Sequence, residues 1–253
     1  MADTTTQNAY KAVFFDLDGT LLHIDMQEFL EGYFDALRVC ATRNGQDPDV
    51  IVKAVQNGVD FMINDLSGST NSQRFWEGFA QVTGAGEDDF SAFFDDFYDT
   101  EYRSLGTDVE ADPDALRAVQ ACVDKGYVCY LTTMPLFPLE AVTERLSWAG
   151  IDDPELFDRI TTYDNSTFTK HNEQYFQENV DVAGCDPSEV LVVGNNTVED
   201  LSCMKLGCDA FVVLDDLIDE NEFDVSTVKN GTLHEFADWC DRLPAVMPDV
   251  NLA

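Results

Sequence analysis

The chain has 253 residues, of which 45% are hydrophobic and 11% aromatic, values that suit one or two globular domains and exclude a disordered chain. Its 49 Asp and Glu residues against 14 Lys and Arg give a net charge of −35, which argues against a nucleic-acid or anionic-membrane partner. The opening segment is polar without a signal-peptide pattern, no stretch is apolar enough to cross a bilayer, and the seven cysteines lack paired spacing, so we expect a cytoplasmic protein with reduced thiols.

The first predicted element is a short buried strand at residues 11–15, which ends in two aspartates one residue apart. Asp16 and Asp18 therefore lie just past the carboxyl end of a strand, which is the edge of an α/β sheet at which ligands bind. Two carboxylates so close together repel each other unless a cation lies between them, and Mg²⁺ prefers such oxygen ligands. Gly19 allows the chain to turn sharply away from the strand.

A run of helices with no convincing strand follows, from about residue 26 to residue 105. Apolar and aromatic residues recur there at helical spacing, and they predict amphipathic helices at about 26–44, 48–66, 70–82 and 88–105. Helices of this kind, placed one after another, predict a small bundle whose aromatic faces form its core.

Beyond residue 112, predicted strands and helices alternate. Strands are expected at 127–131, 159–162, 189–193 and 210–214, and helices at 113–126, 138–150, 170–183, 197–206 and 232–243. This alternation predicts an α/β fold in which a parallel sheet carries helices on both faces. The helical block thus interrupts a sheet domain between its first and second strands.

The run Asp16-Leu17-Asp18-Gly19-Thr20-Leu21 resembles the first motif of the haloacid dehalogenase superfamily, a hydrophobic strand followed by Asp-x-Asp-Gly-Thr-Leu. In the phosphatases of that family the first Asp is the nucleophile and the second is the general acid and base, which would be Asp16 and Asp18 here. The family inserts a helical lid, the C1 cap, where the helical block stands. The resemblance therefore implies a Rossmann-like α/β core at 1–22 and 107–253 and an α-helical bundle cap at 23–106.

Two further positions resemble the second and third motifs of the same family. Thr132-Thr133-Met134-Pro135 follows the second predicted sheet strand, and Thr133 matches the hydroxyl residue that holds the transferring phosphoryl group. Thr132 is the alternative register, and Met134 stands where the family commonly has Asn. Lys170 matches the family's lysine, whose ammonium group holds the phosphate and moderates its repulsion from the nucleophile.

The stretch that ends at Asp200 resembles the fourth motif, which consists of an apolar strand, Gly-Asp, four residues and Asp, and which supplies acidic metal ligands. Asn195 stands at the first acidic position, and a Gly-Asn-Asp register would place Asn196 there instead. An amide oxygen can bind Mg²⁺ but carries no charge, so each lost carboxylate should weaken the site. The resemblance implies a Mg²⁺ site made of the Asp16 carboxylate, the Asp18 backbone carbonyl, Asn195 and Asp200.

These observations predict a Mg²⁺-dependent phosphatase that hydrolyses a small phosphorylated metabolite through a phospho-aspartate. A phosphomutase on the same fold is an alternative, because it shares Asp16 and Asp18. A second alternative is a catalytically weakened binding or regulatory protein, which Asn195, Asn196 and Met134 suggest. A dehalogenase is disfavoured, since the residue two after its nucleophile is usually not Asp. The sequence leaves the substrate and the oligomeric state open.

Overall fold

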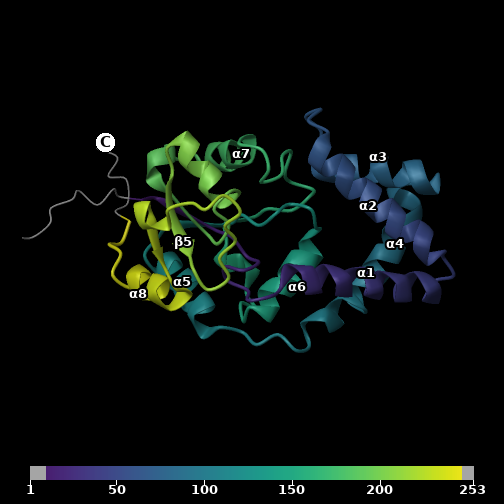
Figure 1. Ribbon diagram of the computed structural model, residues 1–253, viewed down its shortest axis with the longest axis horizontal. Helices are drawn as coiled ribbons and strands as arrows, with labels where there is room; N and C mark the ends of the chain where they lie inside the picture. Colours follow the sequence, from purple (N-terminus) through teal and green to yellow (C-terminus); the bar gives the residue numbers. More distant parts are fainter. Residues whose placement is uncertain (1–9, 247–253) are drawn as a thin grey trace, which may run out of the picture.

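The computed structural model describes residues 10–246 and contains a parallel sheet of six strands, which lies in the left half of Figure 1. The strand order is β3-β2-β1-β4-β5-β6, and every neighbouring pair is parallel. The strands are β1 (Ala12–Phe15), β2 (Val128–Leu131), β3 (Arg159–Ile160), β4 (Val190–Gly194), β5 (Asp209–Val213) and β6 (Lys229–Gly231). Phe15 is level with Leu131 and Val193, so β1, β2 and β4 end at one edge of the sheet. The predicted α/β class is confirmed, and the outer ends of the predicted core segments lie outside the described residues.

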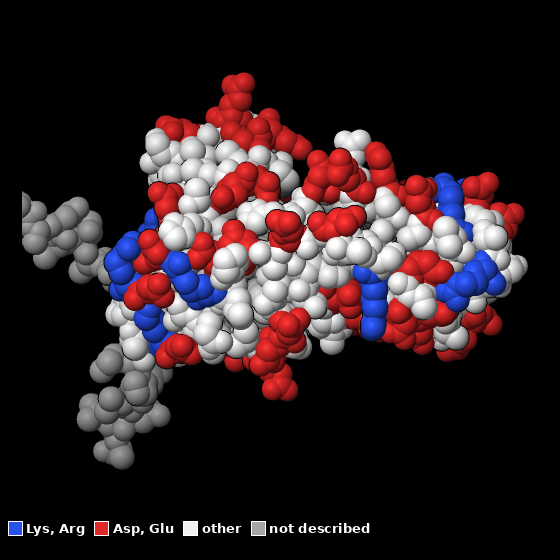
Figure 2. All heavy atoms as spheres, turned by 90° about the horizontal axis from the view of Figure 1, so that it is seen from below, with Lys and Arg blue, Asp and Glu red and all other residues white. Residues whose placement is uncertain are grey.

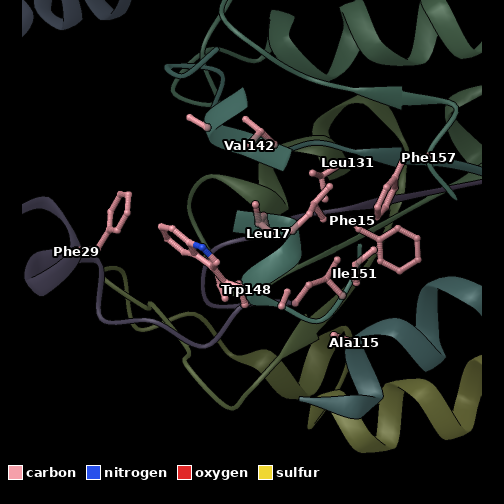
Figure 3. Packing of buried hydrophobic residues seen from close by; sticks show 14 of the residues in the cluster. Phe15, Leu17, Phe29, Ala115, Leu131, Val142, Trp148, Ile151 and Phe157 are labelled. Carbon is pink, nitrogen blue, oxygen red and sulfur yellow. The ribbon is translucent and has the colours of Figure 1, made fainter. Parts of the chain in front are cut away.

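Helices cover both faces of the sheet, as the continuous apolar runs of its central strands require. The covering helices are α5 (Pro113–Asp124), α6 (Leu139–Trp148), α7 (Gln174–Ala183), the 3₁₀ helix η4 (Asp200–Leu206) and α8 (Leu233–Cys240). Val13 and Phe15 of β1 join the apolar cluster of α5, α6 and α8, part of which Figure 3 shows around Phe15. Ala12 and Phe14 point the other way and join the cluster of α7 and η4.

A helical insertion stands between β1 and β2 and lies to one side of the sheet, at the right of Figure 1. It contains α1 (Met26–Arg43), α2 (Pro48–Asn64), α3 (Asn71–Thr83), α4 (Glu87–Asp99) and the 3₁₀ helix η1 (Tyr102–Gly106). Side chains cap its helices: Asp25 and Asp47 accept backbone N–H bonds of α1 and α2, and Thr70 caps α3. Aromatic rings of α3 and α4 fill its interior; the centroids of Phe79 and Phe90 are 5.0 Å apart. This region fits the predicted helical cap, and the residue limits given for the cap stay a prediction.

Some elements differ from the prediction. β6 is absent from the predicted elements, because it has three residues and two of them are exposed, which leaves no apolar run. The helix expected from residue 170 begins at Gln174, since Lys170 lies in a turn that directs its ammonium group into the protein. The helix expected at 197–206 is shorter, and its described form is the 3₁₀ helix η4 that begins at Asp200.

Hydrogen bonds at the start of α3 join the insertion to the sheet domain. The backbone N–H groups of Asn71 and Ser72 donate to carbonyl oxygens of the loop after β3, at 2.9 and 2.8 Å. Arg74 is 1% exposed and donates to the carbonyl oxygen of Asp65 in the insertion and to that of Thr167 in the sheet domain. The buried Arg74 guanidinium therefore joins the helical insertion to the sheet domain through these two hydrogen bonds.

Replacing Arg74 by Met is expected to lower the free energy of unfolding by about 3 kcal/mol, because partly buried carbonyl groups on both sides lose their donor. Urea denaturation of the wild type and the variant measures this difference. Arg38 on α1, whose ion pairs are exposed, gives the control: Arg38→Met should stay within about 0.5 kcal/mol of the wild type. Equal stabilities of Arg74→Met and the wild type would show that the bridge contributes nothing.

Acidic side chains dominate the surface. Figure 2 shows Asp and Glu scattered over one face, on both the sheet domain and the helical insertion, with Lys and Arg gathered mainly toward the two ends. Many of the negative charges behind the net charge of −35 therefore lie on the surface, where the acidic side chains repel one another. Within residues 10–246, no helix has both the length and the apolar character needed to span a bilayer.

Salt should stabilise this protein. Raising NaCl from about 0.1 M to about 1 M shortens the screening length from about 10 Å to about 3 Å, which weakens the repulsion among the surface carboxylates. We expect the Tm to rise by at least about 4 °C over this range, measured by differential scanning calorimetry. A sucrose series of equal osmolality separates the ionic effect from general solute exclusion. A Tm that stays constant or falls with NaCl would contradict the expectation.

Candidate active site

The predicted functional residues converge on one pocket of about 670 Å³, which lies at the sheet edge where β1, β2 and β4 end. The start of α1 lines the side of this pocket that faces the insertion. Because parallel strands bring their carboxyl ends to one edge, segments far apart in the sequence meet here. The pocket lining includes Asp16, Asp18, Thr133, Lys170, Asn195 and Asp200.

Asp16 directly follows β1, and its backbone N–H donates to the Val193 carbonyl at 2.8 Å, which extends the pairing of β1 with β4. Its side chain is buried and both carboxylate oxygens have partners. Oδ1 accepts from the Lys170 ammonium at 2.5 Å, and Oδ2 accepts from the Thr20 hydroxyl at 3.0 Å. The Asp16 carboxylate is thus held in a fixed orientation at the pocket wall.

Lys170 joins two carboxylates, since its Nζ also lies 2.8 Å from Oδ1 of Asp200. Burial opposes the charge on this ammonium group, but Asp16 and Asp200 outweigh burial and raise the pKa of Lys170 well above its ordinary value. Burial raises the pKa of Asp200 to about 6, against the opposing effect of Lys170. The other Asp200 oxygen accepts from the Asn196 backbone N–H at 2.9 Å. A single buried cation therefore holds the nucleophile candidate and the fourth-motif acid together.

Asp18 has a cation of its own. Oδ2 lies 2.5 Å from Nη1 of Arg145 and 3.4 Å from the Thr133 hydroxyl. The Arg145 guanidinium lies over the Phe137 ring, 4.6 Å from its centroid. Burial raises the pKa of the Asp18 carboxyl, while Arg145 opposes this effect. Asp18 Oδ1 and Arg145 Nη2 are buried and have no hydrogen-bond partner among the described residues, so each keeps an unused hydrogen-bonding position.

Sequence reasoning missed Arg145 and gave Thr20 no role. Arg145 is 1% exposed on α6, four residues after the buried Ala141 and one before the buried Leu146. The signal was present, because this position belongs to the apolar face of the helix, where an arginine needs a partner. The helical periodicity of α6 predicts that Arg145 is buried, and a buried arginine indicates an acidic partner beside this helix.

The two threonines of the second motif divide their tasks. Thr132 is fully buried, and its hydroxyl donates to the Phe15 carbonyl at 3.3 Å, which ties β2 to β1. Thr133 lines the pocket beside Asp18, and Met134 lines it as well. The placement matches the Thr133 register rather than the Thr132 register.

Asn195 is linked to Asp16 through the hydroxyl of Thr20. Its Nδ2 donates to the Asp216 carbonyl at 2.6 Å, and its Oδ1 lies 3.3 Å from the Thr20 hydroxyl that also contacts Asp16. A side chain at Gly19 would place its Cβ 2.1 Å from Asn195 Nδ2, so this close approach requires glycine, as does the φ of +80°.

Asn196 lines the pocket as well, and its side chain holds the turn before η4. Its side-chain oxygen accepts the backbone N–H groups of Val198 and Glu199 at 2.9 and 3.1 Å, which shapes the turn before η4. Of these two fourth-motif amides, Asn195 is thus the one whose oxygen contacts the Thr20 hydroxyl beside Asp16.

The donor set suits a hard divalent cation in chemical type. The pocket offers the carboxylates of Asp16 and Asp200 and the amide oxygen of Asn195, all oxygen ligands of the kind that Mg²⁺ takes. Across residues 10–246, no group of three or more His, Cys, Asp and Glu side chains is arranged to hold a metal. Lys170 already neutralises part of the carboxylate charge, so a cation placed there would bind only weakly.

Comparisons with known proteins agree with this architecture. A family model described as haloacid dehalogenase-like hydrolase matches residues 10–205, whereas no curated protein matches the chain. A structure described as a predicted phosphoglycolate phosphatase from Haemophilus somnus 129pt is 18% identical, with a TM-score of 0.54 over 92% of this chain and 99% of that one.

Two further solved structures share the fold. A HAD phosphatase from Thermococcus onnurineus is 19% identical, with a TM-score of 0.53 over 93% of this chain and 100% of that one. A 2-haloacid dehalogenase from Pseudomonas syringae pv. tomato DC3000 is 16% identical, with a TM-score of 0.62 over 90% of this chain and 97% of that one. At such identities the likeness concerns the fold alone, and the family assignment rests on the family model. The chain belongs to the haloacid dehalogenase-like hydrolases.

Proposed function

We propose that this protein is a phosphatase that hydrolyses a small phosphate monoester through a phospho-aspartate on Asp16. The observation that carries this proposal is the placement of a second carboxylate, Asp18, in the same pocket as Asp16. A dehalogenation needs no acid at that position to protonate a leaving alcohol, whereas phosphoester cleavage does.

The chemistry proceeds in two steps. An Asp16 oxygen attacks phosphorus, the bond from phosphorus to the ester oxygen breaks, and Asp18 supplies the proton that the departing alkoxide needs. Asp18 then accepts a proton from a water molecule that attacks the phosphorus of phospho-Asp16, which releases phosphate and restores the carboxylate. Lys170 and Thr133 hold the non-bridging oxygens, on which negative charge is spread.

Mg²⁺, when bound through Asp16, the Asp18 carbonyl, Asn195 and Asp200, would neutralise charge on the phosphoryl oxygens. The helical insertion would exclude water from the pocket and contact the leaving group. Small esters suit this arrangement better than phosphoproteins, because the pocket is bounded on one side by α1.

The proposal is tested by phosphate release from 4-nitrophenyl phosphate at increasing Mg²⁺, with chloride release from 2-chloropropionate measured in parallel. Magnesium-dependent phosphate release without chloride release would support it. Chloride release alone would overturn it in favour of a dehalogenase. Transfer of phosphate to a second hydroxyl of a sugar phosphate, in place of release, would indicate the phosphomutase alternative.

The Asn195→Asp variant should lower the Mg²⁺ concentration for half-maximal activity about tenfold, since it adds a carboxylate to the cation site. Without Mg²⁺ the same variant should have a lower Tm than the wild type for two reasons. Its new carboxylate adds a negative charge near Asp16, and it cannot donate the hydrogen bond that the Asn195 amide gives to the Asp216 carbonyl. Titrations of activity and of Tm with Mg²⁺ measure both effects.

Asn196→Asp is the matched control, because it adds the same charge one residue away while a carboxylate can still accept the N–H groups of the turn. Its Mg²⁺ requirement should change less than that of Asn195→Asp. A larger gain from Asn196→Asp would assign the cation to the other register of the fourth motif.

A further inference from the structure

A second cavity of about 390 Å³ adjoins the active-site pocket. It lies between the helical insertion and the loops that follow β2 and β3. Leu30 of α1 and Leu136 and Phe137 of the loop after β2 line both spaces, so the two are neighbours across these three side chains. The two spaces therefore share one wall, which a molecule held at Asp16 would have to pass to reach the cavity.

The wall of this cavity is apolar and mainly aromatic. Asp60 is the charged residue in its lining. Trp76 is 9% exposed, and its Nε1 is buried without a hydrogen-bond partner among the described residues. A cavity of this kind suits a flat apolar group better than a sugar or a second phosphate. Its aromatic side chains include Tyr33, Phe34, Phe75, Trp76, Phe94 and Tyr98.

The charges around the active-site pocket also favour an uncharged leaving group. Its lining carries Asp25, Glu199 and Asp216 in addition to the three site carboxylates, whereas its cations, Lys170 and Arg145, are each paired with an aspartate. A second anionic group on the substrate would meet these acids without a free cation to bind it. The part of the substrate beyond the phosphate should therefore be uncharged.

We propose that the substrate is the phosphate monoester of an apolar, ring-bearing alcohol, with its phosphate at Asp16 and its ring in the aromatic cavity. This inference rests on the proposed phosphatase function and specifies its substrate class. The linker between phosphate and ring would run past Leu30, Leu136 and Phe137, the side chains that line both spaces.

The test compares two esters of primary alcohols that differ in their far end, 3-phenylpropyl phosphate and glycerol 1-phosphate. The wild type should have a kcat/KM at least about tenfold higher for the phenylpropyl ester. Val59 on α2 lines the cavity, and Val59→Phe should fill it and remove this preference while leaving glycerol 1-phosphate turnover unchanged. Val50→Phe is the matched control, because Val50 is 40% exposed on the same helix and does not line the cavity.

A direct binding measurement accompanies the kinetics. 3-Phenylpropanol should change the tryptophan fluorescence of the wild type and of Val50→Phe, and should bind Val59→Phe at least about tenfold more weakly. Hydrolysis of both esters with no preference, or no binding of the alcohol, would overturn the substrate class and leave the phosphatase function standing. Hydrolysis of 4-nitrophenyl phosphate but of neither ester would overturn the substrate class alone, whereas no phosphate release from any of the three at any Mg²⁺ concentration would overturn the phosphatase function, and this inference with it.

Discussion

Replacing Asp16 by Asn is expected to reduce phosphate release at least about 10³-fold, because the amide cannot form the phospho-enzyme. The substitution keeps the shape of the side chain, and the Thr20 hydroxyl and the Lys170 ammonium retain other acceptors in Asn195 and Asp200. The folded structure should therefore persist. Steady-state release from 4-nitrophenyl phosphate measures the loss, and circular dichroism verifies the fold.

The Asp18→Asn variant distinguishes the two aspartates. Nitrophenolate leaves without a proton, so the first step should still occur, while the second step lacks the base that activates water. We expect a burst of nitrophenolate close to the enzyme concentration, followed by slow turnover. Asp16→Asn should give no burst.

Asp35, an exposed residue of α1, serves as the charge-matched control, and Asp35→Asn should retain wild-type turnover. Residual turnover by Asp16→Asn above about one tenth of the wild-type rate would exclude Asp16 as the nucleophile. A burst from Asp16→Asn would place the covalent intermediate on another residue.

The parts of this site that could be predicted from the sequence are those marked by patterns of neighbouring residues. β1 and the two aspartates that follow it are contiguous in the sequence. The apolar run of β1 predicts a strand that is buried on both faces of the sheet, and Val13 and Phe14 are indeed buried on opposite faces. The convergence of Asp16, Thr133 and Lys170 on one pocket follows from parallel strands that end at one edge.

Other features depend on contacts between distant segments. The ion pair of Asp18 with Arg145 joins residues 127 positions apart, and the helical pattern of α6 shows only that Arg145 is buried. The choice between Asn195 and Asn196 is made by hydrogen bonds to the Asp216 carbonyl and to the turn before η4. No local pattern contains these partners, so both registers stayed open in the sequence.

Lys170 is the residue whose loss should damage both stability and turnover. Lys170→Met leaves Asp16 and Asp200 buried without their shared cation, and we expect the free energy of unfolding to fall by about 3–5 kcal/mol. Phosphate release should fall about 10²-fold or more, because the transferring group loses a positive charge. Urea denaturation in EDTA and steady-state kinetics in Mg²⁺ measure the two effects.

The stability difference between Lys170→Met and the wild type should also depend on pH. The pKa of Asp200 is raised from 3.8 to about 6, so the folded state binds the proton more tightly than the unfolded state, and this contribution is lost as pH rises from about 4 through about 6. Removing Lys170 removes the cation that opposes this shift, which extends the loss to higher pH. The deficit of Lys170→Met should thus be larger at pH 8 than at pH 5. Lys205→Met, which removes an exposed lysine paired with Glu173, should show no such difference. A deficit that is equal at both pH values would mean that Lys170 stabilises the fold by packing rather than by pairing the two carboxylates.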